Sequence, residues 1–150
     1  MENEDPHNLE RFVQAQEGSY ERALEELKQG DKRSHWIWYI LPQLIGLGSS
    51  STAEKYGIHS LDEAKAYLAH PVLGPRLIEC CRALLAVEGK SASHIMGYPD
   101  DLKLRSSATL FSIANDDESD AAETHPEFRE LLEKYYNGEP DHLTLERLTP

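Results

Sequence analysis

The segment that most constrains the fold is WIWYIL (residues 36–41), because it has the composition of a buried β-strand. Aromatic and β-branched residues favour strands. No second run of this kind occurs in the chain, and a strand without a partner leaves its backbone groups without hydrogen bonds. We therefore expect a buried helix from His35 that ends before Pro42, since the residue before a proline avoids helical conformation. This choice makes the protein all-α.

Helical patterns account for the rest of the chain. Apolar residues recur at i, i+3, i+4 and i+7 over residues 20–27, with charged residues on the other face, and Gly30 follows as a stop. The sequence SLDE at residues 60–63 is a capping box, in which a serine hydroxyl and a glutamate carboxylate bond first-turn amides. Residues 124–127 offer a second capping box. Both predict helix starts.

The ends of other helices follow from their flanking residues. Asp5 followed by Pro6 is expected to open the first helix, since these types suit the N-cap and the first helical position. Residues 102–114 are expected to be helical, and residues 115–123 (NDDESDAAE) to form an acidic loop. We predict a single orthogonal domain over residues 1–150, with about seven to nine mostly short helices.

Charge and composition disfavour several classes of function. Fifteen basic residues against 27 acidic ones give a net charge of −12, which argues against a nucleic-acid partner. No apolar run approaches the roughly 20 residues that span a bilayer, and the N-terminal residues are too polar for a secretory signal. The two cysteines, Cys80 and Cys81, are adjacent and lack the spacing of metal or redox sites. We expect a cytoplasmic protein with reduced, packed thiols.

The tryptophan-rich segment carries the first candidate site. His35, Tyr39 and Gln43 are spaced four residues apart, so a helix would place them on one face. Buried polar groups without partners cost about 1–3 kcal/mol each. The row is therefore either a satisfied internal network or the lining of a ligand cavity, which Trp36 and Trp38 would wall.

A glycine-rich turn follows this segment. Gly46, Gly48 and Ser49 precede an expected helix start, where free amides favour phosphate. The turn lacks both the dinucleotide-binding and the Walker patterns. Gly48 and Ser49 are thus ligand-binding candidates, with an ordinary tight turn as the alternative.

The second candidate site lies at residues 101–107. Lys103, Ser106 and Ser107 fall at i, i+3 and i+4, so one helix face carries a cation and two hydroxyls suited to a phosphate or sugar. Asp101 beside them is the candidate general base. In the alternative interpretation, Asp101 caps the helix and the serines allow close helix packing. The scattered histidines lack metal-ligand spacing, so no metal or cofactor is expected.

The chain resembles the bacterial family known as domain of unknown function 1810. The segments that carry the resemblance are DPHNLERFVQAQ (5–16), SHWIW (34–38), PQLIGLGSS (42–50), EAKAYLAHPVLGPRL (63–77) and KLRSSATLF (103–111). The resemblance implies a small, mostly α-helical protein with no established activity, and it assigns no catalytic residue. Two departures from the family pattern are Ala108, where methionine is usual, and a longer acidic loop near Asp116.

We therefore expect a pocket between the tryptophan segment and the Lys103–Ser107 helix. It would bind a small phosphate- or ribose-bearing metabolite, with or without converting it chemically. The alternative is a non-enzymatic protein–protein interaction module whose polar core is internally satisfied and whose exposed apolar surface meets a partner.

Overall fold

The computed structural model describes residues 5–117 and 125–148, and within these ranges the named elements are all helices. The all-α class predicted from the sequence is confirmed. The described ranges hold ten helices, one more than the largest number expected. They are α1 (Glu10–Gln16), α2 (Tyr20–Gln29), α3 (Ile37–Ile40), α4 (Ser51–Tyr56), α5 (Leu61–Ala69), α6 (Leu73–Ala86), α7 (Ala92–Met96), α8 (Asp100–Asp117), α9 (Glu127–Tyr136) and α10 (His142–Leu148). Over the same ranges, none is long and apolar enough to cross a membrane.

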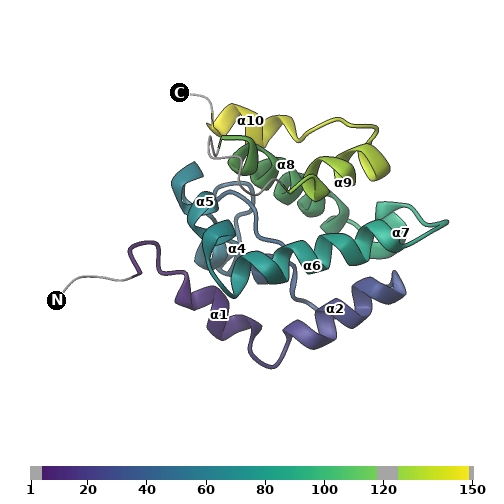
Figure 1. Ribbon diagram of the computed structural model, residues 1–150, viewed down its shortest axis with the longest axis horizontal. Helices are drawn as coiled ribbons and strands as arrows, with labels where there is room; N and C mark the ends of the chain where they lie inside the picture. Colours follow the sequence, from purple (N-terminus) through teal and green to yellow (C-terminus); the bar gives the residue numbers. More distant parts are fainter. Residues whose placement is uncertain (1–4, 118–124, 149–150) are drawn as a thin grey trace.

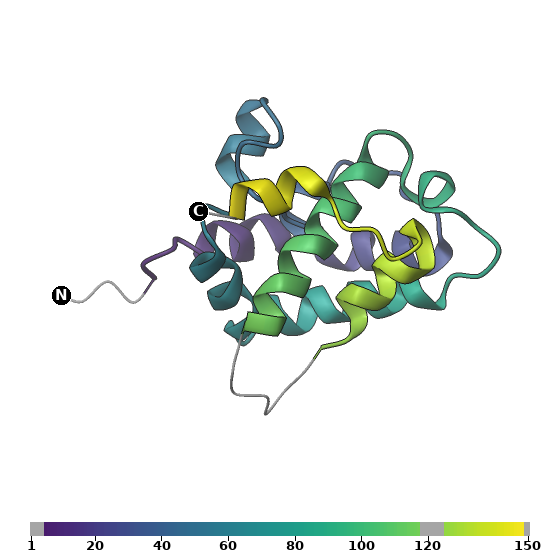
Figure 2. The same cartoon turned by 90° about the horizontal axis from the view of Figure 1, so that it is seen from above.

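Helix α6 runs through the middle of the molecule. Helices α1 and α2 lie on one side of it, and α8, α9 and α10 lie on the other (Figure 1). Helix α8 packs against α5, α9 and α10, and α10 lies beside α8 when the molecule is seen from above (Figure 2). Leu73, Leu77 and Leu84 recur at helical spacing on the buried face of α6. The helices cross one another rather than running side by side as in a regular bundle.

A continuous series of aromatic contacts links the surface helix α4 to the far side of the core. Each ring centroid lies within 6 Å of the next. The series is Tyr39–Tyr56 (5.4 Å), Tyr56–Phe12 (5.9 Å), Phe12–Tyr67 (5.1 Å), Tyr67–Phe111 (5.3 Å) and Phe111–Phe128 (5.7 Å). Aromatic pairs at such distances stabilise beyond their buried area.

The tryptophan segment is not the long helix predicted from the sequence. Helix α3 has only four residues, and the chain leaves it at Leu41, which has a non-helical conformation (φ −127°, ψ 72°) before Pro42. Leu44 then forms an isolated parallel bridge with Ile58, in which Ile45 N–H donates to the Ile58 carbonyl at 2.8 Å. The sequence offers no second strand, and the tryptophan-rich segment instead pairs with a single residue after α4, Ile58. His35, Tyr39 and Gln43 therefore do not share a helix face.

Two predicted helix starts differ in detail from the structure. Helix α1 begins at Glu10 rather than directly after Pro6, and the Asp5 carboxylate accepts from the backbone N–H of Leu9 (2.7 Å) and of Glu10 (2.9 Å). The capping box at residues 60–63 is half formed. The Ser60 hydroxyl accepts from Glu63 N–H, as expected. The Glu63 carboxylate, however, accepts from the N–H of His59 and not from that of Ser60.

Helix α8 is longer at both ends than the predicted residues 102–114. It extends to Asp117, so the first part of the expected acidic loop is helical. The rest of that loop, residues 118–123, and Thr124 of the second capping box lie outside the described residues. Glu127 of that box pairs with Arg82 of α6 instead, with 2.9 Å between Arg82 Nε and Glu127 Oε2.

Candidate functional site

A buried carboxylate holds the segment that leads into α3. Glu26 Oε1 accepts from the backbone N–H of Arg33 (2.7 Å) and Ser34 (2.9 Å) and from the indole N–H of Trp36 (2.9 Å). Its Oε2 accepts from the Ser34 hydroxyl at 2.7 Å. Burial raises the pKa of Glu26, but these hydrogen bonds outweigh it and lower the pKa to about 2. Trp36 is 1% exposed, so it belongs to the core and does not wall a pocket.

The tryptophan segment and the start of α8 are neighbours, as expected from the sequence. Lys32 Nζ lies 2.7 Å from Asp100 Oδ2, and Lys103 Nζ lies 3.4 Å from Asp100 Oδ1. Each ammonium also lies 4.9 Å from the centroid of an indole ring, Lys32 over Trp36 and Lys103 over Trp38. Asp100, which was not a candidate from the sequence, therefore pairs with both of the lysines that lie over the two indole rings.

The polar residues of α8 are engaged within the protein. The Ser106 hydroxyl donates to the Leu102 carbonyl one turn earlier at 3.1 Å, and Ser107 is 2% exposed. Asp101 is the second residue of α8, and its Oδ1 accepts from the N–H of the next residue, Leu102, at 3.0 Å, so it does not cap the helix. Mid-helix serines that bond their own helix allow close packing. This geometry corresponds to the structural alternative for the two serines.

A surface cavity of about 390 Å³ lies between α3 and α4, and we call it the α3–α4 pocket. Three of the predicted ligand-binding residues line it, and helix α4 completes it in place of α8. The residues that line it are His35, Trp38, Tyr39, Ser51, Thr52, Lys55 and Tyr56. Lys55 Nζ lies 5.3 Å from the Tyr56 ring centroid. The pocket thus combines three aromatic rings with a lysine, a histidine and two hydroxyls.

Gln43, Gly48 and Ser49 shape the approach to α4. The Gln43 carbonyl accepts from Ile58 N–H at 3.0 Å in the isolated bridge. A Cβ atom on Gly48 would lie 2.9 Å from the Cβ of Ala53, so glycine permits close contact between the turn and α4. Ser49 is exposed, and its neighbour Ser50 caps α4. The turn is a packing element beside the pocket.

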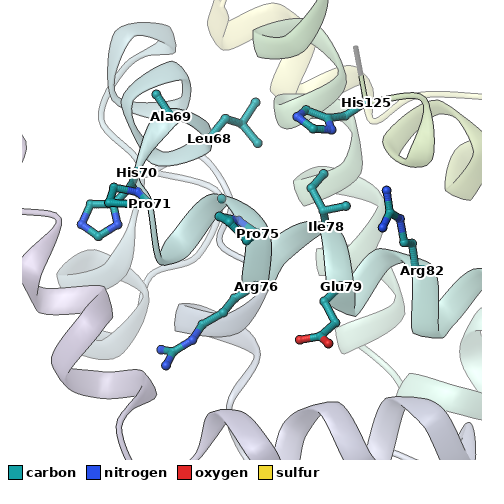
Figure 3. Close-up of a pocket in the computed structure, with 11 residues that line it drawn as sticks. Leu68, Ala69, His70, Pro71, Pro75, Arg76, Ile78, Glu79, Arg82 and His125 are labelled. Atoms are coloured by element: carbon teal, nitrogen blue, oxygen red, sulfur yellow. The ribbon is translucent and has the colours of Figure 1, made fainter. Parts of the chain in front are cut away.

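The largest cavity that we describe was not predicted from the sequence. It measures about 690 Å³ and lies between the end of α5, the start of α6 and the segment before α9 (Figure 3). The residues that line it are Leu68, Ala69, His70, Pro71, Gly74, Pro75, Arg76, Ile78, Glu79, Arg82 and His125. The signal in the sequence is HPVLGP at residues 70–75, where two prolines and a glycine set the turn between two helices.

The charged groups of this α5–α6 cavity bond other parts of the protein. Arg76 and Glu79 point away from Leu68 and His125 in Figure 3, toward the N-terminal helices. The Arg76 guanidinium lies over the Tyr20 ring at 4.7 Å, and the Tyr20 hydroxyl donates to Glu79. Arg82 is the residue that pairs with Glu127. The cavity is therefore less suited to recognising a charged ligand than the α3–α4 pocket.

The fold and the site define an all-α protein with a tryptophan–carboxylate centre and solvent-open pockets around its shorter helices. The chain belongs to the family described as protein of unknown function (DUF1810), whose sequence model matches residues 6–148. Its structure is similar to the crystal structure of the conserved hypothetical protein Rv1873 from Mycobacterium tuberculosis. The two share 50% sequence identity over 97% of this chain and 99% of that chain, with a TM-score of 0.91. A search of curated proteins finds no match.

Proposed function

We propose that the protein binds a small phosphate- or ribose-bearing metabolite in the α3–α4 pocket. One observation carries the proposal: the rings of Trp38, Tyr39 and Tyr56 and the side chains of Lys55 and His35 line the same cavity. Aromatic rings offer stacking faces to a planar group. Ammonium and imidazole groups with neighbouring hydroxyls offer charge and hydrogen bonds to phosphate and sugar oxygens.

The proposed site differs from the one expected from the sequence. Trp36, Ser106 and Ser107 are buried and are not part of it. Lys103 does not line the pocket. Its ammonium lies over the ring of Trp38, which does, and is paired with Asp100. The proposal is for binding and includes no catalytic step.

Isothermal titration calorimetry with adenosine monophosphate (AMP) and ribose 5-phosphate tests the proposal. We expect the wild type to bind at least one of them, and Lys55→Met to weaken that binding by roughly tenfold, since a hydrogen bond to a charged group contributes about 1.5–3 kcal/mol. Lys28→Met is the matched control, because Lys28 is an exposed residue of α2 that does not line the pocket. If neither compound produced a heat of binding at millimolar concentration, the proposal would be rejected.

The alternative function, a protein interaction module, is favoured by a different feature. Tyr98, just before α8, is 79% exposed, and Leu102, in its first turn, is 47% exposed. Exposed apolar pairs of this kind occur at protein interfaces. Two results together would favour this function. The first is a ligand titration that shows no binding. The second is a sedimentation coefficient that rises with protein concentration for the wild type but not for Leu102→Ser.

A further inference from the structure

A second cavity adjoins the α3–α4 pocket and shares one residue with it. This cavity measures about 360 Å³, and we call it the α1–α5 cavity. The residues that line it are Pro6, His7, Asn8, Arg11, Lys55, His59 and Glu63. Lys55 lines both cavities. Residues 51–56 thus contribute to the aromatic pocket, and Lys55 and His59 contribute to the second cavity.

Arg11 fastens the walls of the second cavity together. Its Nε donates to the Lys55 carbonyl at 2.8 Å, and its two terminal nitrogens donate to the carbonyls of His7 (2.8 Å), Asn8 (2.7 Å) and Gly57 (3.0 Å). The guanidinium also pairs with the Glu63 carboxylate at 2.8 Å. Every nitrogen of Arg11 is thus engaged within the protein, and its charge is balanced. Arg11 holds the cavity in shape and is not a ligand-binding group.

Glu63 orients the histidine that faces this cavity. The Glu63 side chain is 2% exposed, and its Oε1 accepts from His59 N–H at 3.0 Å and lies 3.1 Å from His59 Nδ1. A carboxylate paired with arginine only accepts hydrogen bonds, so Nδ1 carries the proton of this contact. Nε2 is then the ring nitrogen left for other partners. The His59 side chain is 61% exposed, which leaves it accessible.

Lys55 supplies charge that is not neutralised within the protein. Over residues 5–117 and 125–148, its ammonium contacts the Tyr56 ring and forms no ion pair with a carboxylate. The one carboxylate that lines the cavity, Glu63, is already paired with Arg11. The cavity therefore places the Lys55 ammonium, which no carboxylate neutralises, beside the imidazole rings of His59 and His7 on a chain whose net charge is −12. Such a site favours an anion.

We infer that the α1–α5 cavity holds the phosphate group of the ligand whose planar part lies in the α3–α4 pocket. The inference rests on the proposed function and names its ligand class: a compound with a planar ring and a phosphate monoester, such as a nucleoside monophosphate. Lys55 lies where the two parts of the ligand join. His59 Nε2 is the ring nitrogen placed to form a hydrogen bond with a phosphate oxygen.

Calorimetry with matched pairs of nucleosides and nucleotides tests this subsite. The probes are adenosine with AMP and uridine with UMP. We expect a nucleotide to bind the wild type roughly tenfold or more tightly than its nucleoside. His59→Gln should remove most of that advantage while leaving nucleoside affinity unchanged. His94→Gln is the matched control, because His94 is an exposed residue of α7 that lines neither cavity.

The outcomes separate the subsite from the proposed function. Nucleosides that bind as tightly as their nucleotides, or a phosphate advantage that His59→Gln leaves intact, would overturn the subsite and leave the proposed function standing. If no probe and no sugar phosphate bound, both would fall. Should His59→Gln unfold, which circular dichroism shows directly, Lys55→Met takes its place and is expected to reduce the same phosphate advantage.

Discussion

Replacing Glu26 with glutamine is expected to destabilise the protein through loss of one buried charge. The pKa of this carboxyl falls from an ordinary 4.5 to about 2 in the folded state. A tenfold change in an acid constant corresponds to about 1.4 kcal/mol, so ionised Glu26 contributes about 3 kcal/mol to the free energy of unfolding at neutral pH. Glutamine keeps the shape and an acceptor oxygen. We therefore expect a loss of about 2–3 kcal/mol at pH 7.

The pH dependence of this effect follows from the direction of the pKa shift. Because the folded-state pKa of Glu26 is lower than that of the unfolded chain, its contribution is fully present above about pH 5. It is lost as the pH falls toward about 2, and at pH 3 about 2 kcal/mol has gone. The difference in stability between wild type and Glu26→Gln should therefore shrink by about 2 kcal/mol between pH 7 and pH 3. Other carboxylates cancel in this comparison.

Urea unfolding followed by far-ultraviolet circular dichroism at the two pH values measures both quantities. Glu25→Gln is the matched control, because Glu25 lies next to Glu26 on α2 but is exposed and bonds only the exposed Gln29 side chain. We expect this control to stay within about 0.5 kcal/mol of the wild type. The reasoning is refuted if Glu26→Gln is as stable as the control at pH 7, or if its deficit is the same at both pH values.

Three further predictions concern the packing of the core. Arg11→Lys should lower the free energy of unfolding by about 2–3 kcal/mol, because an ammonium cannot replace the guanidinium's bond to buried Glu63 together with its bonds to four backbone carbonyls. Gly74→Ala should cost about 3 kcal/mol, since its Cβ would lie 2.1 Å from a backbone oxygen of α5. Cys80 and Cys81 should resist iodoacetamide in the folded protein and react in urea, as mass spectrometry would show, because burial raises the pKa of Cys80 to about 12 and that of Cys81 well above its ordinary value.

The two substitutions each have a control on the same chain. Arg33→Lys should change stability by less than about 1 kcal/mol, because its pair with Asp31 is exposed. Ala86→Gly, at an exposed site near the end of α6, should cost about 1 kcal/mol. Chemical denaturation measures the free energy of unfolding of each variant and its control. If Arg11→Lys lost no more than Arg33→Lys, or Gly74→Ala no more than Ala86→Gly, the corresponding argument would be contradicted. Rapid alkylation of the folded protein would contradict the burial argument for the thiols.

The helices that the sequence predicted well are those with local stop and start signals. Gly30 ends α2 in a left-handed conformation with φ of 67°, and Ser60 caps α5 with its hydroxyl. Both signals act within one turn, so they can be read from neighbouring residues. The start of α1 was missed, because Asp5 caps amides four and five residues away, across Asn8 with φ of 51°.

The candidate site depended on contacts that local patterns do not reveal. Spacing alone grouped His35 with Gln43, but α3 has only four residues and the Gln43 backbone takes part in the Leu44–Ile58 bridge. Spacing also grouped Lys103 with two serines, and only the packing of α8 shows that the hydroxyls turn inward. Helix α4 was predicted as an element, but its position against the aromatic segment comes from tertiary contacts far apart in sequence.

The different settings of the two tryptophans give the molecule two built-in optical probes. Trp36 is sealed against an ionised carboxylate, so its emission reports whether the fold is intact. Trp38 is only partly buried, lines the α3–α4 pocket and carries an ammonium over its ring, so its emission reports what enters that pocket. A ligand that docks in the pocket should change the emission of the wild type but not that of Trp38→Phe, whereas a compound that denatures the protein should change the emission of both.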